Sequence, residues 1–288
     1  MSNNYVIYTD SGCDLSPKLL EEWGVAYRSL TFRFDQSEEE HDNDSMNSSE
    51  FYKLMREGQV AKTSAIAVAT FQDDFEKILA TGKDVLYIAF SSGLSSTYQN
   101  GCVAAEDAMA NYPERKVIVV DTLSASAGQG LLLYLACRKK QEGATLEELA
   151  QYVEDTRLHL CHWFTVDDLV YLKRGGRVSA TTALVGGMLQ IKPVMHMDNE
   201  GHLIKVSTVR GRKASVQALA DHYSASVIDK STPVFICHGD CRDDADKLAE
   251  LIVAAGGPRP EQIVYTGAVI GSHSGPGTLA LFYVGTER

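Results

Sequence analysis

The sequence predicts an α/β protein of two domains, and three observations support this. Its 288 residues are roughly twice the usual length of a domain. Continuous apolar runs at 85–90 and 117–120 each precede a hydroxyl-rich loop and a helix, which is typical of a parallel sheet covered on both faces. Later in the chain, a hairpin pattern introduces antiparallel strands. We therefore expect an N-terminal α/β/α domain with a parallel sheet at 1–157 and a C-terminal α+β domain with a mixed sheet at 158–288.

The first elements can be predicted from turn and cap signals. The run from Tyr5 to Thr9 is apolar and β-branched and predicts a strand. Ser16-Pro17 is typical of a helix N-cap and first helical residue, and Gly24 would end that helix. A second strand is expected from Val25 to Phe34, followed by an exposed acidic loop over 38–49.

Three capping boxes, each a polar N-cap followed three residues later by an acidic side chain, predict further helices. They are Asn47 with Glu50, Thr70 with Asp73 and Thr145 with Glu148, and they start helices near 48–57, 71–80 and 146–158.

The second half of the chain has a different pattern. Apolar runs at 194–197 and 203–206 flank Asp198-Asn199-Glu200-Gly201, which predicts an antiparallel hairpin. The remaining expected elements are strands near 232–237, 262–270 and 279–284, and helices near 211–223 and 241–254.

Composition narrows the class of protein. Hydrophobic residues make up 44% and charged residues 23%, which fits a globular chain and excludes intrinsic disorder. The net charge of -11 repels phosphate backbones and anionic lipid, so we expect no nucleic-acid partner and at most transient membrane contact. The six cysteines are widely scattered, which suits reduced thiols. With neither a secretory signal nor a long apolar stretch, the expected location is cytoplasmic.

Hydroxyl-rich loops follow three of the expected strands, at 9–14, 91–97 and 121–128. In an open α/β sheet, ligands bind beyond the carboxyl ends of the strands. These loops contain no Lys or Arg, so they suit a singly charged acceptor such as a carboxylate better than a triphosphate. The alternative that the hydroxyls only cap helices remains open. The phosphate-binding and dinucleotide glycine motifs are both missing, so no nucleotide cofactor is expected.

His273 lies in the glycine-dense stretch 271–277, which we expect to form a turn after a strand. A His held there could donate a hydrogen bond to a carboxylate, or it could be structural. Ser95 and His273 could also act as nucleophile and base of a serine hydrolase, although Gly93-Leu94-Ser95-Ser96-Thr97 is not the nucleophile-elbow motif.

Two further clusters have competing interpretations. Cys237 and Cys241, with Cys161-His162, suggest a metal site, but their spacing fits a zinc site poorly and no metal is expected. The basic stretches 173–177 and 210–213 are either solvated surface or a docking face for an acidic partner.

Taken together, the motifs resemble the DegV family, the fatty-acid-binding proteins that serve a bacterial fatty acid kinase. The resemblance covers nearly the whole chain and depends on the order of the motifs. They are Thr9-Asp10-Ser11 with Cys13-Asp14-Leu15, Lys62-Thr63-Ser64, Ser91 to Tyr98, Asp121 with Ser126 and Gly128, Leu172 with Gly175-Gly176-Arg177, Ile191-Lys192-Pro193, and His273 to Gly277.

This resemblance implies a non-catalytic carrier that holds a long-chain fatty acid, such as palmitate, between its two domains. It presents the carboxylate to a fatty acid kinase catalytic subunit for acyl-phosphate formation. The resemblance places the carboxylate at Thr63, Ser95 and His273. Secondary contacts with ligand or partner are expected at Ser64, Ser96, Arg177 and Arg210.

Two departures from the family pattern affect the head-group loops. Ala65-Ile66 replaces Gln-Pro, and Ser96 replaces the glycine that follows the binding serine, which allows a different loop shape and a different preferred ligand. The stretch Ala183–Leu189 would suit a tunnel wall or an ordinary helix. The fold also resembles the substrate-binding part of dihydroxyacetone kinases, which leaves a kinase-like or sugar-binding protein as a further alternative, although the missing phosphate loop argues against phosphoryl transfer by this chain alone.

Overall fold

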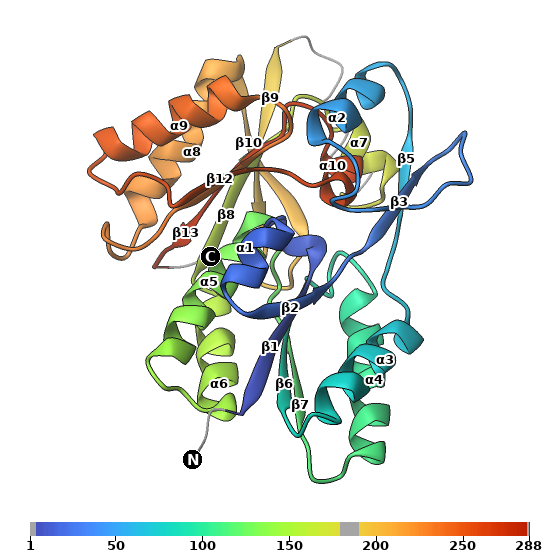
Figure 1. Cartoon of the computed structure of the whole chain (residues 1–288). Coiled ribbons are helices and arrows are strands. Elements are labelled where there is room, and N and C mark those ends of the chain that lie inside the picture. The colour runs from blue at the N-terminus through green and yellow to red at the C-terminus, as the bar shows by residue number, and fades with distance from the viewer. Residues whose placement is uncertain (1–3, 179–189, 287) are drawn as a thin grey trace.

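Two large sheets of different kinds organise the chain (Figure 1). The computed structural model describes residues 4–178, 190–286 and 288. The first sheet is entirely parallel, with the strand order β2-β1-β6-β7. Its strands are β1 (Tyr5–Asp10), β2 (Val25–Arg28), β6 (Asp84–Ala89) and β7 (Val117–Asp121).

The second sheet is mixed and has the order β10-β9-β8-β13-β11-β12. Its only parallel pair in the described chain is β11 with β12. The strands are β8 (Leu160–Thr165), β9 (Ile191–Met197), β10 (Leu203–Arg210), β11 (Phe235–His238), β12 (Gln262–Tyr265) and β13 (Leu279–Val284). The mixed second sheet and the parallel first sheet confirm the predicted fold class.

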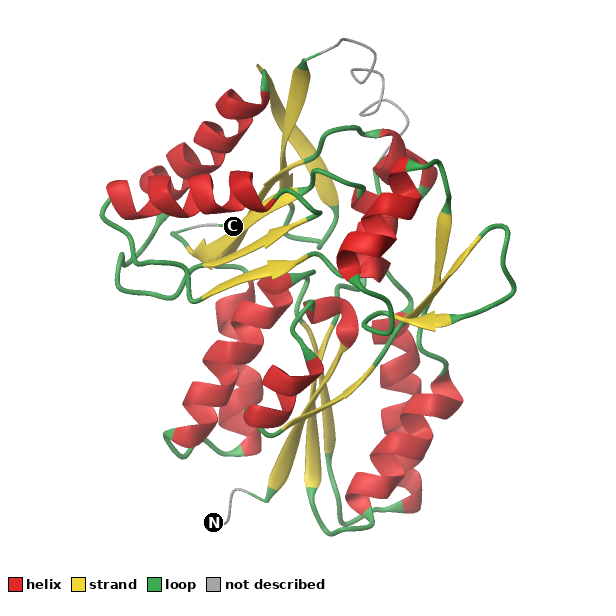
Figure 2. Cartoon of the chain, turned by 45° about the horizontal axis from the view of Figure 1, so that its top comes forward, coloured by secondary structure: helices red, strands yellow, loops and turns green. Residues whose placement is uncertain are grey.

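Helices cover both faces of the first sheet. Figures 1 and 2 show α5 and α6 on one side of it and α3 and α4 on the other. Their bounds are α3 (Val68–Leu79), α4 (Thr97–Asn111), α5 (Ala127–Gln141) and α6 (Leu146–Arg157). On the second sheet, α8 (Arg212–Ser226) and α9 (Arg242–Ala254) pack together over one face, and α5 contacts the other. Helix α5 therefore serves both sheets.

A small third sheet and short helices lie beside the junction of the two large sheets (Figure 1). The third sheet has the order β4-β3-β5, with β3 (Thr31–Phe34), β4 (His41–Asp42) and β5 (Ala61–Ser64). The helices are α2 (Ser48–Arg56), α7 (Val170–Arg174) and α10 (Ala268–Ser274). Helix α1 (Pro17–Glu22) precedes β2, and a short 3-10 turn at Ser11–Cys13 follows β1.

Several local predictions are confirmed. Residues Val85 to Ile88 are fully buried, as expected for a strand covered on both faces. Ser16 accepts a hydrogen bond from the backbone N–H of Leu19 and caps α1. Thr145 and Glu148 form the reciprocal capping box at the start of α6.

The predicted strand from Val25 to Phe34 is wrong, because two strands of different sheets occupy it. The break falls at Ser29 and Leu30. The Ser11 hydroxyl accepts the N–H of Leu30 at 2.9 Å, and the Ser29 hydroxyl accepts the N–H of Asn43 at 2.9 Å. At this point, hydrogen bonds from the backbone to side chains thus replace the backbone hydrogen bonds of a sheet. The loop expected over 38–49 also contains the short strand β4.

The prediction that Thr70 caps a helix is also wrong. Helix α3 begins at Val68, its N-cap is Ala67, and no side chain caps it. Thr70 therefore lies inside the first turn of the helix.

A third correction concerns His273. The strand expected over 262–270 ends at Tyr265, and the stretch expected as a turn contributes to α10. The side-chain oxygen of Asn43 accepts the N–H of Val269 at 2.8 Å and satisfies the first turn of this helix. His273 therefore lies in the last turn of a helix.

The structure neither confirms nor contradicts two further predictions. The domain boundary predicted after residue 157 falls between α6 and β8 and stays a prediction. The tunnel wall predicted at Ala183–Leu189 lies outside the described residues. In the described part of the chain, none of the helices has the length and apolar character needed to cross a membrane.

Gly128 allows α5 to approach the second sheet closely. A Cβ atom built there would lie 2.4 Å from His162 Nε2 and 2.7 Å from Phe282 Cδ1. We expect Gly128→Ala to lower the free energy of unfolding by about 1–3 kcal/mol, because helix and sheet must separate to admit the methyl group. Urea unfolding measures this. Gln141→Ala, at an exposed position of the same helix, should change it by less than about 0.5 kcal/mol. Equal effects would contradict the steric explanation.

Candidate functional site

A cavity of about 260 Å³ lies between the carboxyl ends of the first sheet and the second sheet. The loops after β6 and β7 supply one part of its wall, including Phe90, Ser95 and Ser126. Side chains of the second sheet, including Phe164 and Phe282, supply another. The position agrees with the rule that open α/β sheets bind ligands beyond the carboxyl ends of their strands.

The cavity changes character with depth. Ser64, Ala65 and Ser96 line it and are exposed to solvent, so they mark its mouth. Phe90 and Met197 also line it but are 5% and 1% exposed. The cavity thus runs from a polar surface opening to a largely apolar interior, a shape suited to an amphipathic ligand.

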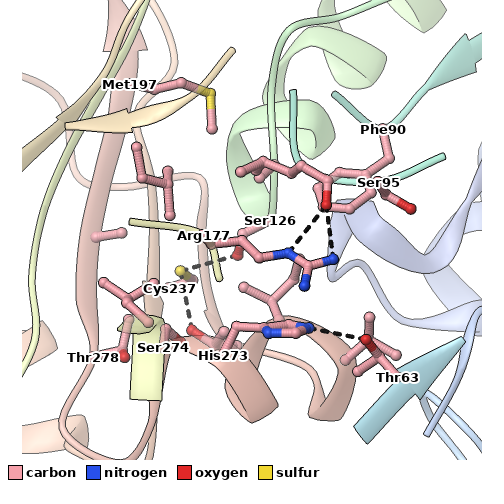
Figure 3. A pocket seen from close by; sticks show the side chains of 18 of the residues that line it. Thr63, Phe90, Ser95, Ser126, Arg177, Met197, Cys237, His273, Ser274 and Thr278 are labelled. Atoms are coloured by element: carbon pink, nitrogen blue, oxygen red, sulfur yellow. Dashed lines mark hydrogen bonds between the residues drawn. The ribbon is translucent and has the colours of Figure 1, made fainter. Parts of the chain in front are cut away.

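Thr63, Ser95 and His273 all line this cavity, although they come from three separate parts of the chain. Thr63 lies on β5, and its Oγ1 is 2.9 Å from Nε2 of His273 on α10 (Figure 3). Ser95 lies in the loop before α4, where its Oγ is 2.9 Å from Oγ1 of Thr97 and accepts the Thr97 N–H. The structure therefore brings the three residues predicted for the head group into one site.

His273 is neutral near neutral pH. Burial, together with the positive charge of Arg177, lowers its pKa to about 4. Its Nδ1 packs against Gly175, where a Cβ atom would lie 2.1 Å from that nitrogen. Glycine is needed at this point to let the ring approach the backbone. In the neutral ring, Nε2 acts as the donor or the acceptor toward Thr63 Oγ1, depending on the tautomer.

Arg177 brings a positive charge into the cavity. Its Nε and Nη2 donate to the carbonyl oxygen of Leu94 at 3.2 and 3.0 Å, and its Nη1 donates to that of Gly175. A guanidinium has five N–H groups, so two remain for an anionic ligand. Burial lowers its pKa, but an arginine keeps its charge at physiological pH. Of the lining residues that the structure describes, none other carries a permanent charge.

The basic stretch 173–177 therefore divides between two environments. Lys173 and Arg174 are exposed, as a solvated surface requires. Arg177 turns into the cavity after Gly176, which has a φ of +71°. This backbone conformation favours glycine, and the Gly175-Gly176 pair was the signal in the sequence for such a reversal.

Of the predicted secondary contacts, Arg177 lines the cavity, whereas the others lie at its mouth or outside it. Ser64 and Ser96 line the exposed opening. Arg210, at the end of β10, is exposed and does not line the cavity. The structure thus does not bring Arg210 to the head-group residues.

The geometry does not support the serine hydrolase interpretation. The Ser95 hydroxyl pairs with Thr97, and His273 pairs with Thr63, so the nucleophile–base hydrogen bond is not formed. Within residues 4–178 and 190–286, we also find no group of three or more His, Cys, Asp or Glu side chains that could hold a metal ion.

Comparison with known proteins identifies the family. The family model described as "Uncharacterised protein, DegV family" matches residues 4–286. The chain belongs to the DegV family. A DegV domain-containing protein of Clostridium perfringens is 38% identical over 286 residues, covering 99% of this chain and 98% of that protein.

Solved DegV structures share this fold. A DegV family protein from Thermus thermophilus, described by its fatty acid binding, has a TM-score of 0.88 and 29% identity, covering 98% of this chain and 99% of its own. DegV from Bacillus subtilis, described as a fatty acid binding protein, has a TM-score of 0.82 and 26% identity, covering 99% of this chain and 100% of its own. Both of these relatives are thus described as binding fatty acids.

The buried neutral His273 should make this DegV protein sensitive to acid. Because its folded-state pKa of about 4 lies below the unfolded value of about 6.5, the unfolded chain takes up this proton first as pH falls. We expect the contribution of His273 to the free energy of unfolding to be fully present above pH ~6.5. It should be lost between pH ~6.5 and ~4, which lowers the free energy of unfolding by up to about 3 kcal/mol. Urea unfolding at several pH values measures it.

His273→Asn should unfold with a shallower dependence on pH in that window. Thr63→Val removes the hydrogen bond to His273 but keeps the titrating ring, so it should retain the slope of the unmodified protein. An unchanged slope in His273→Asn would contradict the assignment.

Proposed function

We propose that this DegV protein binds one long-chain fatty acid in the cavity, with the carboxylate at Thr63, Ser95, His273 and Arg177. The single observation that carries the proposal is the gradient of the cavity, polar and charged near its mouth and apolar within. The wall draws on residues from both sides of position 157, in keeping with a ligand held between two domains.

The apolar interior would supply most of the affinity. Burial of a methylene is worth about 0.8 kcal/mol, so the roughly fourteen methylenes of palmitate give about 11 kcal/mol before several kcal/mol of association cost. Phe90, Phe164, Met197 and Phe282 offer the aromatic and flexible contacts that suit such a chain.

The head group would then require orientation and charge compensation. The hydroxyls of Thr63 and Ser95 can each donate one hydrogen bond to a carboxylate oxygen. The free N–H groups of Arg177 would offset the negative charge. The hydroxyl-rich loops supply only neutral donors, and Arg177, predicted as a secondary contact, would add a positive charge to the site.

The carrier role is the finer part of the proposal. With its carboxylate near the exposed Ser64 and Ser96, a bound fatty acid would be accessible to a fatty acid kinase catalytic subunit. Lys173 and Arg174, exposed on the segment that leads to Arg177, would offer positive charge to an acidic partner. The six widely scattered cysteines suit reduced thiols and hence a cytoplasmic location.

Loss of the Ser95 hydroxyl should weaken ligand capture. We expect Ser95→Ala to bind palmitate about tenfold more weakly, because one hydrogen bond to a charged group is lost. Isothermal titration of delipidated protein measures this, and native mass spectrometry of protein from bacterial cells should detect a co-purified lipid. Ser92→Ala, an exposed serine of the same loop, should bind as the unmodified protein does. Absence of palmitate binding by the unmodified protein would refute the function.

The same variant tests presentation to the kinase. With palmitate saturating both proteins, Ser95→Ala should form acyl phosphate more slowly than the unmodified protein, because the carboxylate is held less precisely. The assay follows acyl hydroxamate formed from the reaction mixture with a fatty acid kinase catalytic subunit. Equal rates would argue against an orienting role for Ser95.

A further inference from the structure

A second group of polar side chains lines the interior of the cavity. Ser126, Cys237, Thr266 and Ser274 all lie in its wall, and their exposed fractions are 5%, 1%, 1% and 6%. They are therefore far more buried than Ser64 and Ser96 at the mouth. A wholly apolar chain would not need these groups along its path.

Three of these residues form a connected chain of contacts. Oγ1 of Thr266 lies 3.2 Å from Sγ of Cys237, and that sulfur lies 3.1 Å from Oγ of Ser126. The Ser126 hydroxyl donates to the carboxylate of Asp14. Figure 3 shows the contacts of Cys237 on one side of the Arg177 guanidinium, with Thr63 on the other. This chain keeps its polar atoms in place but leaves lone pairs on the hydroxyl oxygens.

Ser274 has hydrogen-bonding capacity that the described protein does not use. Its Oγ is buried and has no partner among the described residues. By contrast, Ser272 in the same helix donates to the carbonyl oxygen of Ala268 at 2.6 Å. A buried hydroxyl without a partner is destabilising, so its persistence at a cavity wall points to a group supplied by the ligand.

We infer that this interior polar wall binds a hydroxyl group on the acyl chain, so that the preferred ligands are hydroxylated long-chain fatty acids. The inference rests on the proposed fatty-acid binding and adds a second point of recognition within the same cavity. The carboxylate would be held near the mouth, and the hydroxyl would meet Ser274 and its neighbours further in.

The chemistry of the wall favours a hydroxyl over other polar substituents. A hydroxyl both donates and accepts, so it can accept from Ser274 and donate to the lone pairs of Thr266 or Ser126. A keto group could only accept hydrogen bonds, so the lone pairs of Thr266 and Ser126 would gain no donor from it. A second carboxylate would lose its hydration in this buried part of the wall, beside the carboxyl of Asp14, and that cost opposes its binding.

The test compares palmitate with a series of hydroxypalmitates that carry the hydroxyl at successive positions along the chain. Isothermal titration of the delipidated full chain should find one position, or two adjacent ones, that binds about tenfold more tightly than palmitate. Ser274→Ala should lose that preference and bind palmitate at least as tightly as before, because the unpaired hydroxyl is gone. A thermal melt of the variant confirms that it is folded.

Ser272→Ala is the matched control, since its hydroxyl is on the same helix but is satisfied within the protein and does not line the cavity. It should keep the preference. Binding of palmitate without preference for any hydroxypalmitate would overturn this inference while leaving the proposed function intact. A preference that survives Ser274→Ala would also overturn it. Failure of every ligand to bind would overturn both.

Discussion

The structure depends on one helix that packs against two sheets. Helix α5 begins immediately after the loop that follows β7. Its apolar side chains are buried against the first sheet on one side and against the second sheet on the other. Gly128 gives it the close approach to His162 and Phe282. Because both sheets must meet this helix, the carboxyl-end loops of the first sheet face the second sheet, and the cavity forms between them.

That arrangement separates charge from apolar surface within one cavity. Arg177 is held by two backbone carbonyls, so its charge is fixed in position before any ligand enters. His273 beside it stays neutral because burial and the neighbouring guanidinium both oppose its protonation. A mouth with one cation and several hydroxyls, leading to aromatic walls, matches an amphipathic acid.

Much of the fold could be predicted because its signals are local. The buried run of β6 and the capping box of Thr145 act through neighbours in the chain, and both predictions are confirmed. The equivalent signal at Thr70 failed, since α3 begins before it without a side-chain cap. A cap motif describes a compatible helix start; only the packing of the preceding residues decides whether the chain uses it.

By itself, the sequence determined the alternation of strands and helices, the fold class and, through the resemblance to the DegV family, six residues that line the cavity, three of them predicted for the head group. Thr63, Ser95 and His273 could be found because each lies in a short motif of characteristic order. Tertiary structure alone decided the rest. Helix α10 forms where a strand and a turn were expected, with Asn43 satisfying the N–H of Val269 from 226 residues away, and the carbonyl of Leu94 fixes the direction of the Arg177 guanidinium. Such partners are distant in sequence, so no local pattern encodes them.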